Sequence, residues 1–315
     1  MRIYYLNLFI KFILISIFVS ILFLEIFHNK DLIINILNNN LIFLSIILTL
    51  QLFYLLIYNF RTYSVYKNFL SKSVSIYLWS IFFFRSLIYN ISVNSAGTVY
   101  RALVLKKMGI GYVKFLAIFN LLFLSYFIIN FFYILLEVFF FTDLNFKFKL
   151  AYFFIFLLLF IFCFSLPKLL ILILKKLMFL GVNIKKIINI LSFLINSFNK
   201  KIFNNHFYSL FILGSALHFF ELLIFYFSCK MFIVEISFEK ILLLFAVSFL
   251  LDRIPFLSNI IGSNEIIFGF FSTYLGLLFH EGVLIKFLIR LTGITIIILS
   301  FIYSNIFFKS KKLIL

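Results

Sequence analysis

Two short polar stretches interrupt a sequence that is otherwise almost continuous Phe, Ile and Leu. Residues 93–101 read VNSAGTVYR, and residues 252–265 read DRIPFLSNIIGSNE. Each stretch has a glycine directly before a hydroxyl residue: Gly97 before Thr98, and Gly262 before Ser263. Glycine and proline break helices, and the freed helix ends expose backbone dipoles that can bind an ion or a charged headgroup. Paired breaks in the two halves of a membrane chain predict a binding site between them.

Ionisable side chains lie beside these breaks or deep in apolar segments. We predict a lipid-headgroup site made by Gly97, Thr98, Arg101, Gly262, Ser263, Asn264, Glu265 and Arg290, with Pro255 as a structural break. An ionisable residue at the bilayer centre is disfavoured by about 3 kcal/mol, so it needs a partner or a role. A guanidinium donates two parallel hydrogen bonds to phosphate or carboxylate. The arginines are therefore expected to bind an anion, and Glu265 to be their counter-charge or to bind a cationic headgroup.

Structural interpretations of the same residues remain open. Arg101 can extend its charge to the cytoplasmic interface, and Glu265 can cap the helix that begins after it. Asp252 and Arg253 are interpreted as an interfacial pair. The deeper arginines, Arg85 and Arg290, can bind lipid phosphate or form an interhelical ion pair with an acidic residue, Glu137, Glu221 or Glu265.

The remaining polar residues do not form a catalytic or metal-binding pattern. His218 and Glu221 share a helix face, but the second such motif that a metal bundle needs is missing, so a structural pair is favoured. Cys163 and Cys229 lie in apolar runs without a second Cys or His at ligand spacing, which argues against a disulfide or zinc site. We therefore expect no enzyme activity, no metal and no cofactor.

The elements that position the predicted site must be membrane helices. Of the 315 residues, 65% are hydrophobic and only 12% are charged, about half the charged share of a soluble domain. Several apolar runs reach the roughly 20 residues that a helix needs to cross the hydrocarbon core. The alternating polarity of a β-barrel is absent. The sequence predicts an all-α polytopic membrane protein with about eight transmembrane helices plus re-entrant or broken helices.

We expect one integral membrane domain over residues 1–315. Its parts are a first half, about 1–174, an amphipathic cytoplasmic connector, about 175–206, and a second half, about 207–315. One break in each half is compatible with an inverted repeat. The expected apolar spans are 9–27, 41–60, 74–93, 113–141, 150–174, 207–229, 240–256, 266–280 and 283–308.

The net charge of +18 comes from lysines and arginines in short segments between the apolar runs. This distribution favours an anionic membrane surface as partner, and not nucleic acid. The positive-inside rule places residues 94–114 and 175–206 and both termini in the cytoplasm, and the chain in the cell membrane, which is the inner one in a Gram-negative cell. Segment 74–93 then cannot be a simple crossing: either it is re-entrant, or one of the basic loops breaks the positive-inside rule.

The first polar stretch resembles the Pro-x-x-x-Gly-Glu-x-x-Arg motif of the lysylphosphatidylglycerol synthase transmembrane family, also called the flippase-like domain family. Gly97 and Arg101 match, while Val93 stands in place of the proline and Thr98 in place of the glutamate. The polar residues that the family carries in the following helix are here apolar or Asn, around 120–124.

The second polar stretch is similar to the family's Pro-x-x-x-x-Gly-x-Gly-x-x-Glu motif. Pro255, Gly262 and Glu265 are in register, Ile260 replaces the first glycine, and Arg290 falls where the family has a downstream arginine. The likeness extends over most of the chain, although each motif is short.

The resemblance implies a translocator of lipids or lipid-linked sugars, with a phospholipid or a polyprenyl-linked glycolipid as its partner. It also implies a separately encoded glycosyltransferase or aminoacyl-transferase as partner, because no aminoacyl-transferase domain is expected in this chain. A non-catalytic membrane scaffold for an envelope lipid- or glycan-modifying enzyme is the alternative. A membrane-embedded transferase is less favoured, since it would need convergent catalytic groups.

Overall fold

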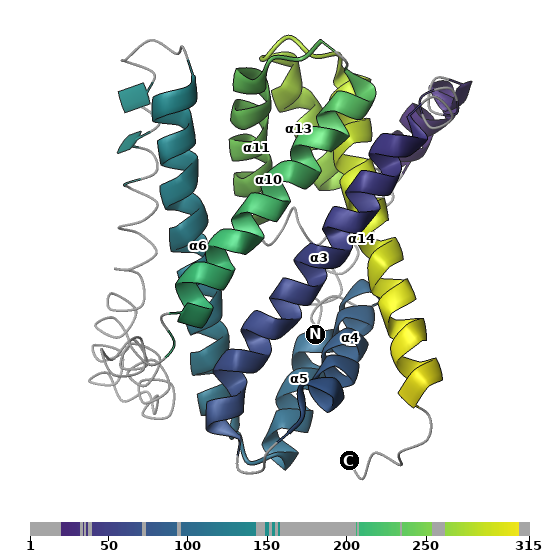
Figure 1. Cartoon of the computed structure of the whole chain (residues 1–315). Helices are drawn as coiled ribbons and strands as arrows, with labels where there is room; N and C mark the ends of the chain where they lie inside the picture. The colour runs from purple at the N-terminus through teal and green to yellow at the C-terminus, as the bar shows by residue number, and fades with distance from the viewer. Residues whose placement is uncertain are drawn as a thin grey trace, which may run out of the picture. The chain divides into compact units, whose positions relative to one another are not determined.

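The computed structural model describes most of the chain, namely residues 20–31, 34, 36, 40–70, 74–92, 96–142, 149, 150, 153, 154, 157, 206, 208–233, 235–253 and 262–308. Every regular element within these ranges is helical (Figure 1), which confirms the predicted all-α class. In chain order the elements are α3 (Leu41–Tyr66), η1 (Lys67–Phe69), α4 (Ile76–Ser92), α5 (Ala96–Lys107), α6 (Tyr112–Phe141), η2 (Tyr208–Ile212), α10 (Leu213–Phe232), α11 (Phe238–Arg253), α13 (Ser263–Thr273) and α14 (Phe279–Phe308).

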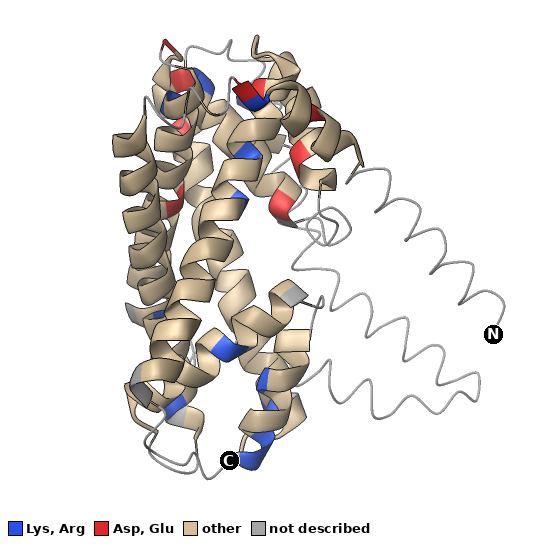
Figure 2. Cartoon of the chain, turned by 90° about the vertical axis from the view of Figure 1, so that its right-hand side faces the viewer, with Lys and Arg blue, Asp and Glu red and all other residues tan. Residues whose placement is uncertain are grey.

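Four of the described helices are long and apolar enough to cross a membrane. They comprise Leu41–Tyr66, Lys114–Phe141, Ser209–Phe232 and Phe279–Ile306. Most of the helical ribbon in Figure 2 is tan, so Lys, Arg, Asp and Glu are few along the described helices. These helices support a membrane protein, whereas the expected total of about eight crossings stays a prediction.

The predicted span 266–280 is wrong as a single helix. Helix α13 ends at Thr273 after 11 residues, and α14 begins at Phe279. Gly276 has a φ of 82° in the turn between them, a left-handed conformation that ends helices and favours glycine. The apolar neighbours of this glycine hid the turn in the sequence.

Several predicted features lie outside the described residues. They are the N-terminal span up to residue 19, nearly all of segment 150–174, the connector 175–205 and the break at Pro255.

The chain divides into two compact units. The first unit contains Met1–Tyr54 and Phe220–Ile296, and the second contains Leu55–Phe219 and Ile297–Leu315. Helices α3, α10 and α14 therefore each contribute residues to both units.

The first unit is built on a cluster of buried apolar side chains from three long helices. Ile47 of α3, Ile224 and Met231 of α10, and Leu288 of α14 form its centre. The short helices α11 and α13 pack against each other, and α13 approaches α14 closely at Gly269 and Gly282. A Cβ on Gly282 would collide with the Ser272 hydroxyl and lie 3.0 Å from the Gly269 Cα, so small residues set this approach.

The second unit contains a hairpin of two short helices, α4 and α5, which lie side by side (Figure 1). Gly97 in the first turn of α5 is buried at the contact. A Cβ there would collide with the carbonyl oxygen of Ser86 and lie 2.7 Å from the Asn90 Oδ1, both on α4. Gly97, the glycine of the first polar stretch, is thus required because the two helices pack closely here.

Candidate functional site

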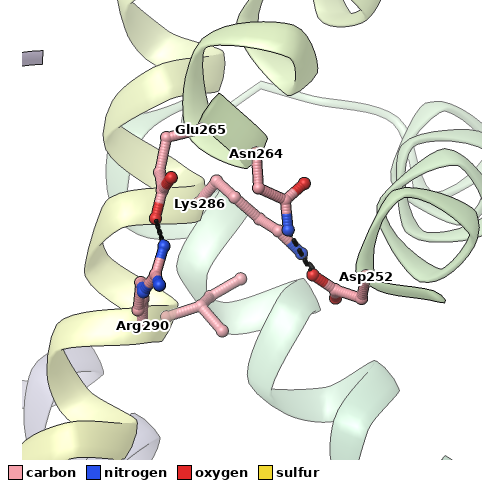
Figure 3. A pocket seen from close by; sticks show the side chains of 6 residues that line it. Asp252, Asn264, Glu265, Lys286 and Arg290 are labelled. Carbon is pink, nitrogen blue, oxygen red and sulfur yellow. Dashed lines mark hydrogen bonds and ion pairs between the residues drawn. The ribbon is translucent and has the colours of Figure 1, made fainter. Parts of the chain in front are cut away.

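A pocket of about 210 Å³ lies in the first unit, where three helices bring charged side chains together. Its lining, which we call the charged pocket, consists of Asp252 from α11, Asn264 and Glu265 from α13, and Lys286, Ile289 and Arg290 from α14 (Figure 3). Two acidic and two basic side chains give it no net formal charge at neutral pH.

Glu265 connects the start of α13 with α14. Its Oε1 accepts a hydrogen bond from the Arg290 Nη1 at 2.8 Å, and its Oε2 accepts one from the backbone N–H of Gly262 at 3.0 Å. Gly262 precedes the helix with a φ of 90°, which glycine adopts without strain. Both structural interpretations of Glu265 and Arg290, the helix cap and the interhelical ion pair, are therefore present.

Asp252 forms the second ion pair of the pocket. Its Oδ2 lies 2.7 Å from the Lys286 Nζ, which also donates to the Ser248 hydroxyl, and its Oδ1 accepts from the Asn264 amide. Asp252 is thus tied to α13 and α14. The Arg253 side chain lies outside the part of the chain that the structure describes, so the expected pair of Asp252 with Arg253 stays a prediction.

The two ion pairs are open to different degrees, and each has one buried and one accessible member. The Glu265 side chain is 1% exposed while that of Arg290 is 30% exposed. The Lys286 side chain is 7% exposed while that of Asp252 is 42% exposed. The accessible charges are therefore one cation and one anion, and the buried charges are their counter-ions.

Asn264 adds an unused acceptor to this pocket. The residue is 5% exposed, and its amide nitrogen donates to Asp252. Its Oδ1 is buried and has no hydrogen-bond partner among the described residues. A buried acceptor without a partner costs free energy, so a donor on a bound molecule would satisfy it.

The other predicted site residues lie in the second unit on α5. Gly97 packs against α4, and Thr98 follows it half-buried. Arg101 is 7% exposed, and its Cζ lies 6.0 Å from the centre of the Phe119 ring. That its charge extends to the cytoplasmic interface stays a prediction. The Arg101 Nε has no hydrogen-bond partner within the described ranges. That these residues share one cavity with Glu265 and Arg290 stays a prediction.

Two further buried polar residues have contacts that the sequence did not predict. The Arg85 Nη2 donates to the Asn305 Oδ1 at 3.2 Å, so one partner of this arginine is an amide. His218 contacts α6, at Asn130 and Glu137.

The sequence did not predict that Lys286 and Ser248 belong to this site. The signal for Lys286 is its spacing from Arg290: two basic residues four apart in an apolar helix share one face and together require nearby acidic groups. Ser248 carries no comparable signal, because a single serine in an apolar helix most often bonds its own backbone. Within the described ranges no group of three or more His, Cys, Asp or Glu residues could hold a metal ion.

Comparison of the chain with protein-family models, with curated proteins and with solved structures finds no match.

Proposed function

We propose that this chain is a lipid translocator of the cell membrane, and that the charged pocket binds the headgroup of a zwitterionic lipid. The observation that carries the proposal is the arrangement of its accessible charges. Arg290 offers a guanidinium to a phosphate or carboxylate, and Asp252 offers a carboxylate to an ammonium group. A headgroup with both charges would satisfy both side chains at once.

The cost of keeping four charged residues here supports a functional pocket. Lys286 and Arg290 belong to α14, which is long and apolar enough to cross a membrane. Ionisable residues in such helices are expensive, and they mark substrate pathways more often than they add stability. Buried ion pairs give little net stability, because the loss of hydration offsets the attraction between the charges.

The order of helix lengths supports a repeated architecture. In the second unit α4, α5 and α6 have 17, 12 and 30 residues. The helices α11, α13 and α14 have 16, 11 and 30 residues. A long apolar helix precedes each set, and each second short helix begins at one of the two glycine motifs. We infer an internal repeat, with α4–α5 and α11–α13 as corresponding hairpins.

We propose that both hairpins are re-entrant, because their helices are shorter than the roughly 20 residues that a crossing needs. With α4 and α5 entering and leaving on one side, the basic segments near Lys67, Lys107 and Lys186 all fall in the cytoplasm, as the positive-inside rule requires. The two halves then have opposite orientations, and there are fewer full crossings than the eight or so expected from apolarity alone. Polar backbone inside a bilayer is tolerated where it lines a cavity.

The test of headgroup binding is native mass spectrometry of the purified protein. We expect a retained zwitterionic phospholipid in the wild-type protein. In the variant Glu265→Gln/Arg290→Gln, which removes both charges of one pair without leaving either buried alone, its occupancy should fall about tenfold or more, as expected for the loss of charged hydrogen bonds.

A matched control removes two exposed charges of the same unit, Glu235→Gln/Lys240→Gln. It should retain the lipid. Equal retention by the pocket variant and the control would remove the basis for a headgroup site and favour a membrane scaffold, in which the ion pairs only hold α11, α13 and α14 together.

A further inference from the structure

His218 of α10 lies between two acceptors on α6, within the second unit. Its Nδ1 is 2.7 Å from the Asn130 Oδ1, and its Nε2 is 2.8 Å from the Glu137 Oε1. His218 is 3% exposed, and the Glu137 side chain is 14% exposed. The two helices are both long and apolar enough to cross a membrane.

The Asn130 amide is held in one orientation. Its Nδ2 donates to the backbone carbonyl of Tyr126 at 2.9 Å. A carbonyl oxygen only accepts, so the amide nitrogen must lie on that side and the amide oxygen must face His218. The Nδ1 of His218 is therefore a donor.

The second ring nitrogen then faces a carboxylate oxygen. A neutral imidazole with its proton on Nδ1 would present a lone pair from Nε2 to the Glu137 Oε1, and two acceptors do not stay 2.8 Å apart. The contact requires a proton between Nε2 and Oε1. That proton is additional to the one on Nδ1, whether it belongs to the imidazole or to the carboxyl group.

We propose that His218 and Glu137 together form a proton-binding site among the membrane-crossing helices. With the proton bound, the pair is neutral overall, either as imidazolium and carboxylate or as imidazole and carboxylic acid. Without it, an uncompensated carboxylate remains among largely buried side chains, which is costly. The Glu137 Oε2 is buried and has no hydrogen-bond partner among the described residues, so no second donor neutralises that carboxylate there.

Other charged or titratable groups lie on the same helices or on α3. The Tyr133 ring of α6 stacks on His218 with its centre 4.9 Å away. Glu221 follows one turn later on α10, and the Arg61 Nε of α3 lies 3.8 Å from the Cβ position of Gly214, one turn earlier. The Lys149 Nζ donates to the carbonyl of Phe139, near the end of α6.

This site is independent of the charged pocket, because its residues come from the second unit and the pocket's residues come from the first. It adds a different ligand, a proton, to a protein for which we propose a lipid substrate. Failure of either proposal leaves the other intact.

The direct test counts the protons on the pair at about pH 8, well above the usual histidine pKa of about 6.5. Nitrogen-15 NMR of the histidine-labelled protein shows how many ring nitrogens of His218 carry hydrogen, with His218→Asn identifying its signals. Infrared spectroscopy of the carboxyl stretch shows whether Glu137 is protonated. We expect either two N–H groups with an ionised carboxylate, or one N–H group with a protonated carboxyl. One N–H group together with an ionised Glu137 would overturn the proposal.

Two variants separate proton binding from general effects of substitution. Glu137→Gln should leave His218 with one N–H group at about pH 8, while the control Glu235→Gln, at an exposed turn, should change nothing. Where Glu137→Gln does not fold, Glu137→Asp provides the test: it keeps a carboxylate on a shorter side chain, so a smaller fraction of the pairs should carry the additional proton. Two N–H groups on His218 in Glu137→Gln, or an unchanged proton count of the pair in Glu137→Asp, would contradict the proposal.

Discussion

Arg290 and Glu265, from α14 and α13, form an ion pair in which the Nη1 lies 2.8 Å from the Oε1 and the carboxylate is almost fully buried. Because the same carboxylate also accepts the Gly262 N–H at the start of α13, this side chain joins the start of one helix to the middle of another. The pair therefore couples local helix capping to the geometry of the pocket.

The substitution Arg290→Gln alone should destabilise the protein by about 3 kcal/mol or more, because it leaves the Glu265 charge buried without its partner. The double variant Glu265→Gln/Arg290→Gln should be less destabilised than the single one, since neither charge remains. Chemical unfolding in detergent, arranged as a double-mutant cycle, measures both values. A double variant less stable than Arg290→Gln alone would show that the pair is not the main interaction of either residue.

Gly97→Ala should destabilise the second unit by about 1 to 3 kcal/mol, because the added Cβ would collide with the backbone of α4 at Ser86. Gly111→Ala is the matched control: nothing lies within 4 Å of the added Cβ, and the residue before α6 has a φ of −60° that alanine adopts readily. Thermal unfolding of both variants in the same detergent tests the difference. Equal melting temperatures would mean that α4 and α5 do not pack as closely as described.

Cysteine accessibility in intact cells tests the proposed topology. In a background without Cys163 and Cys229, an impermeant thiol reagent should label a cysteine at Tyr274, which is 87% exposed in the turn after α13. Cysteines at Lys107 and at Lys186, the latter outside the described residues, should be labelled only after the cells are opened. External labelling at either lysine position would show that the re-entrant arrangement is incorrect.

His206, which precedes η2, should make stability depend on pH. Burial, and to a smaller extent the charge of Lys67, holds the pKa of His206 below its usual range. The unfolded chain therefore binds a proton more readily, so the stabilisation by the neutral ring is complete above about pH 6.5 and is lost as the pH falls toward the lowered value. Melting temperatures of the wild-type protein should decline on acidification more steeply than those of His206→Gln. Identical declines would assign the effect to other groups.

Much of the fold could be predicted from the sequence, because a membrane helix is specified by its length and apolarity. The predicted segments 41–60, 113–141 and 207–229 correspond closely to α3, α6 and α10. The turn at Gly276 was missed because its neighbours are as apolar as the helices on either side, and hydropathy does not detect a change of backbone conformation. For the same reason, the sequence did not predict that α13 ends after 11 residues.

The candidate site was only partly predictable. Glu265 and Arg290 stood out as charges in apolar surroundings, and the structure brings them together. The partners Asp252 and Lys286 are 34 residues apart, and their pairing depends on how α11 packs beside α14, which a single sequence does not encode locally. His218 was read with its neighbour on the same helix because sequence spacing shows such pairs, whereas its contacts with α6 come from tertiary packing.

The most direct test of the account is a leaflet-translocation assay in reconstituted vesicles, with fluorescent lipids that differ only in headgroup. We expect the wild-type protein to move a zwitterionic phospholipid faster than an anionic phospholipid or a neutral glycolipid. The variant Asp252→Asn/Lys286→Gln should lose this preference while Glu235→Gln/Lys240→Gln retains it. Transport that is absent in folded wild-type protein, or that is equal for all headgroups and unchanged in the pocket variant, would contradict the account.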